Sequence, residues 1–202
     1  MIGFIKELMP LDTFRLLVHA FGLQFLSYYL TKFVHRKPKA APKIKLDDKI
    51  RQIPAWTIVY VMAFVQWVVC YYITFRFGTV EKTYMLFADT VSKIVCMLFF
   101  AFMPVTIERP VPSGRFAWLL KFIYKCDKPT NLFPSMHCLL SFLSCAAVAT
   151  IGVIPLGVRI ANCVFSLFVY ASTLFTKQHV FNDVLAGIVL GVVTYSLALI
   201  IF

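Results

Sequence analysis

The sequence predicts an all-α fold: a polytopic membrane bundle of six transmembrane helices that forms one domain over residues 1–202. Hydrophobic residues make up 60% of the chain, charged residues make up 14%, and the mean hydropathy is +0.82. Soluble domains carry about 25% charged residues, so this composition excludes an ordinary soluble protein. Six apolar segments approach the roughly 20 residues that a helix needs to cross a bilayer, at 13–34, 54–75, 83–107, 134–151, 155–175 and 180–202.

The first two predicted spans flank the most basic loop, residues 32–51. The first span carries His19 at a depth where an ionisable side chain is unusual, and we interpret this histidine as packed and neutral. Pro54 opens the second span, at a helix position where its missing N–H costs nothing. The loop between these spans is expected to lie on lipid headgroups.

The third predicted span contains an acid and a base one helical turn apart. Asp89 and Lys93 are expected to neutralise each other inside the bundle. Pro104 should end this helix near Met103, because a proline inside a helix removes a hydrogen bond and clashes with the preceding turn.

The last three spans follow one another closely. Turn residues around Gly152 and Pro155 predict that the fourth and fifth helices are antiparallel neighbours. In the sixth span, Gly187 and Gly191 form a small-x-x-x-small pattern that allows close contact between helices. Because six spans alternate in direction, the loops after the first, third and fifth share one side of the membrane. The loop at 109–133 should therefore lie near the turn at 176–179.

The formal net charge is +11, which raises the possibility of nucleic-acid binding. The basic residues lie in short loops between apolar spans, however, so contact with anionic lipid headgroups explains them better, and no nucleic-acid partner is expected. The six cysteines contain no Cys-x-x-Cys pair. Most of them fall within spans, where we interpret them as small apolar side chains.

The first polar cluster lies at 172–183, before the sixth span. His179 and Asp183 are four residues apart, so on a helix the carboxylate can hold one imidazole nitrogen while the other faces a substrate. This is how a nucleophilic or general-base histidine is oriented. The plainer interpretation is a helix with a polar first turn, in which Asp183 favours the helix dipole.

Two further polar clusters should face the same compartment. Pro134 at a helix start leaves the N–H groups of Ser135 and the next residues aimed outward, which favours an anion. His137 in that first turn can donate a proton to a leaving group. Arg109, just outside the third span, is suited to grip phosphate oxygens with two N–H groups. Taken singly, each cluster is also compatible with a helix cap or a flanking charge.

Together these groups provide the parts of a phosphoryl-transfer site: an oriented nucleophile, a second histidine, a helix N-terminus and an arginine. They resemble the signatures of the type 2 phosphatidic acid phosphatase superfamily, which are integral-membrane lipid phosphatases and phosphotransferases with six spans. Pro-Ser-Met-His at 134–137 resembles the second signature. Ser172, His179 and Asp183 resemble the third, and Arg-Pro at 109–110 resembles the end of the first.

The resemblance covers about residues 109–191, with the catalytic signatures inside 109–183, and it departs from the family pattern at two positions. The lysine expected seven residues before Arg109 is Phe102, and the arginine expected after the signature serine is Thr173. Lys177, and Lys128 or Lys125 in the long loop, are the available replacement cations. The Thr-Lys-Gln-His form at 176–179 is similar to a branch close to inositol-phosphorylceramide synthases.

The resemblance implies a role for each residue of the site. His179 would attack phosphorus to form a phosphohistidine, Asp183 would hold its ring, and His137 would protonate the leaving oxygen and then activate the incoming hydroxyl. A phosphorylated lipid would be the substrate. No metal or cofactor is expected, because cations and donors of the chain would hold the phosphoryl oxygens: Arg109, Ser135, Lys177, Ser172 and Lys128.

Several functions remain open at this point. A lipid phosphatase acting on a monoester or diphosphate is the first, and a phosphotransferase that moves a phospho-headgroup to a hydroxyl acceptor is the second. A non-catalytic transporter, channel or scaffold is the third, favoured by the two missing cations. A metal site built from two histidines and an aspartate is a remote fourth.

Charge and resemblance disagree on the side of the membrane that the site faces. The loops after the first, third and fifth spans hold 14 of the 20 basic residues, which by the positive-inside tendency places the site in the cytosol. Family members usually carry the site on the extracytoplasmic face. Because some of these cations can serve phosphate or headgroups, we favour the extracytoplasmic orientation.

Overall fold

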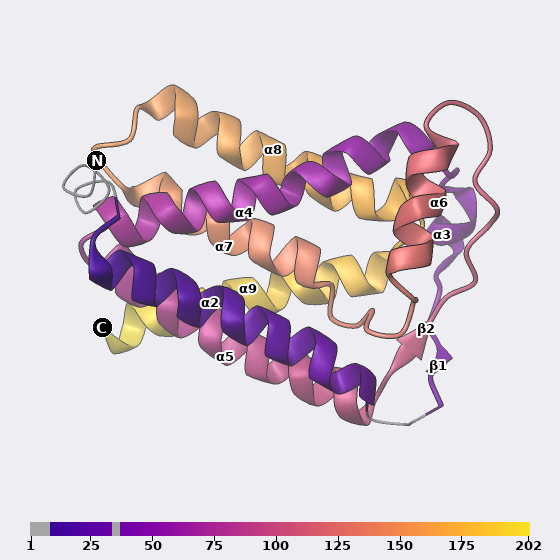
Figure 1. Cartoon of the computed structure of the whole chain (residues 1–202), viewed down its shortest axis with the longest axis horizontal. Coiled ribbons are helices and arrows are strands. Elements are labelled where there is room, and N and C mark those ends of the chain that lie inside the picture. The colour runs from indigo at the N-terminus through magenta and orange to yellow at the C-terminus, as the bar shows by residue number, and fades with distance from the viewer. Residues whose placement is uncertain (1–8, 34–36) are drawn as a thin grey trace.

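The computed structural model describes residues 9–33 and 37–202 and confirms the predicted all-α class. Long helices run along one axis (Figure 1): α2 (Leu11–Tyr29), α4 (Thr57–Phe77), α5 (Glu81–Phe102), α7 (Met136–Thr150), α8 (Leu156–Phe175) and α9 (Phe181–Ile201). The remaining elements are short: η1 (Leu30–Phe33), β1 (Lys39–Ala40), α3 (Lys45–Lys49), η2 (Pro54–Trp56), β2 (Val105–Thr106) and α6 (Ala117–Cys126).

Among the described residues, four helical segments are long and apolar enough to cross a membrane: Pro54–Phe77, Glu81–Phe102, Leu156–Phe175 and Phe181–Ile201. These four indicate a membrane protein. Helix α7 is apolar but has only 15 residues, which at 1.5 Å per residue is about 22 Å, less than the roughly 30 Å of a bilayer core. The predicted end of the first span at position 34 lies outside the described residues.

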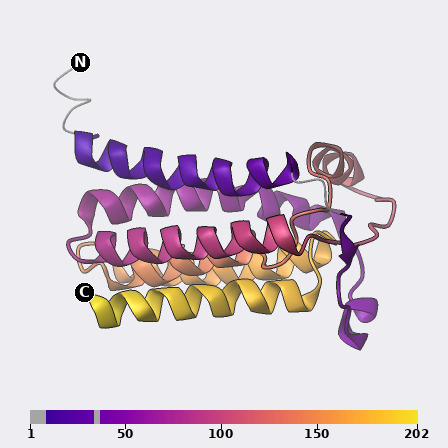
Figure 2. The ribbon, with the colours of Figure 1, turned by 90° about the horizontal axis from the view of Figure 1, so that it is seen from below.

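Helix α7 lies at the centre of the bundle, where it contacts α4, α5, α8 and α9. Figure 2 shows α2 along one side of the bundle and α9 along the opposite side. Helices α7 and α8 are neighbours joined by a tight turn, so the predicted antiparallel pair is confirmed. Helix α5 ends at Phe102 with Met103 as its C-cap, as the proline at position 104 predicts.

The glycine pattern of α9 is confirmed as a close contact with α7. A Cβ atom built on Gly187 would lie 2.3 Å from the backbone oxygen of Ser135, and one built on Gly191 would lie 2.6 Å from Cδ1 of Phe142. Only glycine allows the two helices to approach this closely, because its backbone carries no side chain.

The predicted acid–base pair of α5 is also confirmed. Lys93 Nζ lies 2.8 Å from Asp89 Oδ2, and both side chains are buried. The hydroxyl of Tyr71 donates to Asp89 Oδ1 at 2.5 Å. His19, in contrast, is exposed on α2, with Nε2 3.1 Å from the hydroxyl of Thr90. The prediction that it is packed is wrong, because its side chain lies on the exposed face of α2, while its neighbour Ala20 is buried.

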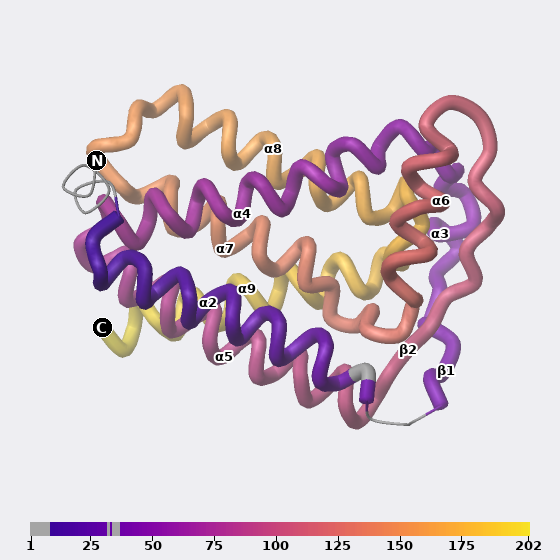
Figure 3. The backbone as a smooth tube through the Cα atoms, in the orientation of Figure 1, coloured from indigo at the N-terminus to yellow at the C-terminus, as the bar shows by residue number. Residues whose placement is uncertain are grey.

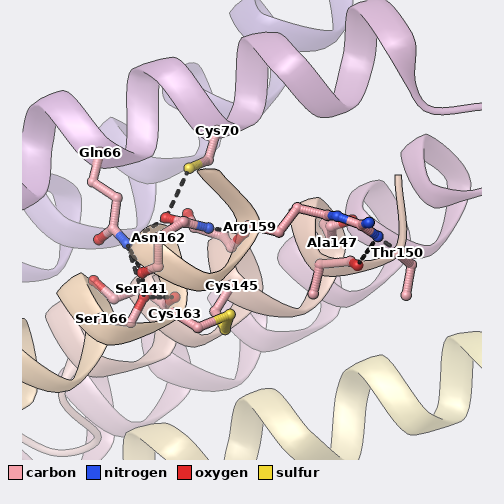
Figure 4. The surroundings of a disulfide bond; sticks show 12 residues. Gln66, Cys70, Ser141, Cys145, Ala147, Thr150, Arg159, Asn162, Cys163 and Ser166 are labelled. Atoms are coloured by element: carbon pink, nitrogen blue, oxygen red, sulfur yellow. Dashed lines mark hydrogen bonds between the residues drawn. A yellow bond between two sulfur atoms is a disulfide. The ribbon is translucent and has the colours of Figure 1, made fainter. Parts of the chain in front are cut away.

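Two cysteines form a disulfide, which the sequence interpretation missed. Cys145 of α7 is bonded to Cys163 of α8, next to a polar network that joins these helices to α4 (Figure 4). In this network, Gln66 donates to the side-chain oxygens of Asn162 and Ser166, each at 2.8 Å. Treating every cysteine as a small apolar side chain was wrong for this pair, because the pairing depends on contacts between helices.

The loops predicted to share one side do so. The start of α2 and the end of α9 lie at one end of the bundle, while α3, α6, the two strands and the α8–α9 turn lie at the other (Figure 3). Strand β1 pairs in parallel with β2, Lys39 opposite Val105. The loop after α2 is therefore held against the loop after α5, at the end where the candidate site lies.

Candidate active site

His179 and Asp183 meet at the junction of α8 and α9. The Nδ1 atom of His179 lies 3.4 Å from Asp183 Oδ2, which also accepts from the N–H of Val180 at 3.2 Å. The predicted pairing is thus present, but His179 lies in the turn before α9 rather than on the helix. Because Nδ1 faces the carboxylate, Nε2 is left for a substrate. The ring lines a cleft of about 380 Å³.

Ser135 is the N-cap of α7, and this corrects one expectation. Helix α7 begins at Met136, not at Pro134, and the hydroxyl of Ser135 accepts from the N–H of Cys138 at 3.4 Å. The N–H of Ser135 donates to the backbone oxygen of Asp183 at 3.0 Å. It is therefore not aimed outward at an anion, and it instead ties the start of α7 to the start of α9.

His137 lies in an enclosure of aromatic rings from α4. Its imidazole is stacked on Tyr60, with ring centroids 4.0 Å apart and planes tilted by 18°, and the rings of Trp67 and Phe64 meet it edge-on at 4.9 and 5.4 Å. The Nε2 atom is buried and has no hydrogen-bond partner within residues 9–33 and 37–202. The N–H of Ser135, two residues before His137, donates to the backbone oxygen of Asp183, so the segments that carry the two predicted histidines are joined.

The two histidines line different clefts. The cleft beside His179 is lined by charged side chains of both signs from α3 and from the loops around it. The cleft beside His137 has a volume of about 250 Å³ and is lined mainly by aromatic and apolar side chains, with Asp127 at its rim. The two predicted histidines thus border surfaces of different polarity.

Arg109 is held at the boundary between the clefts. One terminal nitrogen donates to the backbone oxygen of Asp127 at 2.6 Å, and the other donates to Oε1 of Gln178. Its Cζ lies 4.7 Å from the ring centre of Tyr124. Burial lowers the pKa of Arg109, and the nearby Asp127 carboxylate opposes this effect. The Nε atom is buried, and no described residue accepts a hydrogen bond from it.

Of the other predicted phosphate-binding residues, some lie at the site and others do not. Lys177 lines the His179 cleft, where its Nζ donates to the backbone oxygen of Asp47 at 3.0 Å. Burial lowers its pKa, against the raising effect of Asp47. Ser172 is fully buried and donates to the backbone oxygen of Val169 at 2.7 Å. Lys128 is exposed and lines neither cleft. The structure does not bring Ser172 or Lys128 to the site.

Three residues of the site were not found by sequence reasoning. Gln178 contacts Arg109, Tyr60 is stacked on His137, and Asp47 accepts from the N–H of Phe181 at 2.8 Å. Gln178 lies next to a candidate nucleophile, which was the available signal. Tyr60 and Asp47 carry no local signal, because their positions depend on long-range packing.

The fold and the site together define a helical membrane protein with a paired-histidine site at one end of its bundle. Within residues 9–33 and 37–202, no cluster of three or more His, Cys, Asp or Glu side chains is placed to hold a metal ion. Comparison with protein-family models, with curated proteins and with solved structures finds no match. The assignment of function therefore rests on the residues of the site.

Proposed function

We propose that this protein is a membrane lipid phosphatase that hydrolyses a phosphate monoester or diphosphate of a lipid through a phosphohistidine intermediate. One observation carries the proposal: two histidine segments, distant in the sequence, are joined at one end of an apolar bundle, and one of the histidines is paired with a buried carboxylate. A nucleophilic histidine needs such an orienting partner. An in-line displacement needs a second group on the leaving side.

In the first step of this mechanism, Nε2 of His179 attacks phosphorus and the bond to the lipid oxygen breaks. His137 gives its proton to that oxygen, so the lipid leaves as an alcohol or as a lipid monophosphate. In the second step, His137 takes a proton from water, and the oxygen of this water displaces His179 from phosphorus. Inorganic phosphate is released and both rings return to their starting states.

The surrounding charges favour this reaction. The Asp183 carboxylate fixes the His179 ring and balances the positive charge that it gains on phosphorylation. Lys177 lines the cleft beside His179, and Arg109 contacts Gln178, the residue before His179. Positive groups fixed in advance stabilise the charge that spreads over the equatorial oxygens. The chain's own cations thus take the role that a metal ion has in other phosphatases.

We further propose that α2 and α7 complete six spans, with the site at the membrane interface on the extracytoplasmic face. The apolar cleft beside His137 is formed by residues of α2, α4, α6 and α7. The lipid part of the substrate would contact this cleft, where the leaving oxygen is formed. The polar cleft beside His179 would face water.

A phosphotransferase is the second candidate, and the polar cleft favours it. A volume of about 380 Å³ lined by Lys43, Asp48 and Glu108 exceeds what a single water molecule needs. A polar headgroup or a hydroxyl acceptor would fit beside His179. In this case an acceptor hydroxyl replaces water in the second step, and a new phosphodiester forms in place of inorganic phosphate.

The test is incubation of the purified protein with labelled phospholipids and polyprenyl diphosphates, followed by analysis of inorganic phosphate, new phosphodiesters and acid-labile phosphoprotein. His179→Ala should abolish turnover and labelling. His19→Ala is the matched control, because that histidine is exposed on α2, and it should keep both. Turnover by the His179→Ala protein would contradict the assignment of the nucleophile. Wild-type protein that binds these lipids but turns none over would support a transporter or scaffold instead.

A further inference from the structure

We infer that Gln178 is a further catalytic residue, whose side-chain amide binds an oxygen of the phosphoryl group together with Arg109. This inference deepens the proposed function, because it concerns the same site. Gln178 is 1% exposed, so its polar atoms are withdrawn from water. A buried amide needs hydrogen-bond partners, and this one has only half of them.

The orientation of the amide is fixed by Arg109. A guanidinium has only donors, so the atom of Gln178 that it contacts must be the oxygen, as the Arg109 to Oε1 hydrogen bond has it. The NH₂ group of Gln178 then faces away from Arg109. This Nε2 atom is buried and has no acceptor among the residues that the structure describes, and the same holds for Nε of Arg109. The two side chains thus present unused donors and no unused acceptor, which is the pattern that an anion requires.

The position of this pair relates it to both clefts. The neighbours of Gln178 in sequence, Lys177 and His179, line the polar cleft. Arg109 holds the backbone oxygen of Asp127, a residue that lines the apolar cleft. Gln178 and Arg109 line neither cleft themselves, but the pair stands between residues that line the two. The inference places the phosphoryl group against this pair.

The main chain couples Gln178 to the proposed nucleophile. The N–H groups of Gln178 and His179 both donate to the backbone oxygen of Thr173, at 3.0 and 3.2 Å. Thr173 occupies the position where the resembled signature carries an arginine. The chain thus lacks a guanidinium there, and its buried threonine holds the segment that supplies an amide donor. The neutral amide of Gln178 can donate a hydrogen bond to an equatorial oxygen, as the missing arginine would. It does not supply the positive charge of an arginine.

The test compares Gln178→Glu and Gln178→Met with wild type, using inorganic vanadate, which adopts the trigonal bipyramidal geometry of phosphoryl transfer. The glutamate keeps the acceptor for Arg109 and replaces the amide donor with a second acceptor. Methionine keeps the length of the side chain and removes both. Asn182→Asp is the matched control, because it adds one negative charge in the next helix, where the side chain of Asn182 donates to the backbone oxygen of Pro42.

We expect Gln178→Glu to bind vanadate at least tenfold more weakly in a thermal-shift titration and to lose about 100-fold in kcat, as when one oxyanion donor is removed. Its melting temperature without ligand should stay equal or rise, since the new carboxylate pairs with Arg109. This opposite movement separates a donor role from a structural one. Gln178→Met should also weaken vanadate binding, and Asn182→Asp should stay within about threefold of wild type.

Equal vanadate affinity in wild type and either Gln178 variant would overturn the inference, and so would a wild-type protein that binds no vanadate. Because the titration needs no turnover, its result is distinct from that of the proposed function. A wild-type protein that binds vanadate through Gln178 but releases no phosphate from any lipid would keep the anion site and reject the phosphatase.

Discussion

Replacing Gly187 with alanine tests whether the α7–α9 contact sets the geometry of the site. The new Cβ would lie 2.3 Å from the backbone oxygen of Ser135, about 1 Å inside the 3.4 Å at which ordinary contact begins. The obstacle is a backbone oxygen, which also accepts from the N–H of Leu139 at 3.0 Å. It cannot rotate away as a side chain can, so the helices must separate.

The expected losses of stability and of turnover follow from this separation of the helices. Overpacking of a tight contact costs about 1–3 kcal/mol of stability. The hydrogen bond from Ser135 to Asp183, one helical turn from Gly187, spans 3.0 Å and would be lost if it lengthened by about 1 Å. Since this bond joins the two histidine segments, we expect turnover to fall about 100-fold, as for a catalytic group misplaced by about 1 Å.

Alanine substitutions at two other glycines serve as controls for Gly187→Ala. Gly191→Ala meets the ring of Phe142 at 2.6 Å, and a ring can rotate, so its effect should be smaller. Gly22→Ala on α2 meets no heavy atom within 4 Å, and alanine favours a helix over glycine by about 1 kcal/mol. Thermal unfolding in detergent and release of inorganic phosphate would measure the series. Gly187→Ala as stable and as active as Gly22→Ala would refute the reasoning.

Four further predictions concern the site and the bundle. Tyr60→Leu should lower kcat about 2- to 12-fold, because a stacked pair contributes about 0.5–1.5 kcal/mol; Tyr60→Phe keeps the stacking on His137 and should show wild-type kcat. Asp47→Ala removes the acceptor for the first N–H of α9 and should cost about 1 kcal/mol in thermal unfolding, whereas equal stability would mean that the cap contributes nothing. Lys93→Met should destabilise by about 3–5 kcal/mol, because it leaves Asp89 as an unpaired buried charge, and adding Asp89→Asn should recover most of that loss. Treatment with a chelator should leave phosphate release within about twofold, and a loss restored by added divalent metal would show that the chain's own cations do not suffice.

The helices and much of the site could be predicted because the signals are local. Helix ends follow from residues such as Pro104, and the acid–base pair of α5 follows from a spacing of four residues. The alternation of spans then predicts that remote loops share one end. The packing of Gly187 was also predictable, because two small residues one turn apart on an apolar helix indicate a close contact with a neighbouring helix.

The remaining features depend on contacts between segments far apart in the chain. The N–H of Ser135 was expected to face a ligand, but it bonds to the backbone of α9, a partner 48 residues later. The disulfide between Cys145 and Cys163 needs α7 and α8 in one particular register. Gln178 carries no charge and stands out only when its contact with Arg109 and its unused amide donor are seen together.

The hydrogen bond between Ser135 and Asp183 joins main-chain groups only, and this has a consequence for how the molecule can change. Exchanging the side chain at either position, for any residue but proline at 135, keeps both main-chain groups, so the start of α7 stays joined to the start of α9. The walls of the two clefts, in contrast, are made of side chains. Under the proposed function, the preference for one lipid or another is therefore set at those walls, while the main chain keeps the two histidine segments together.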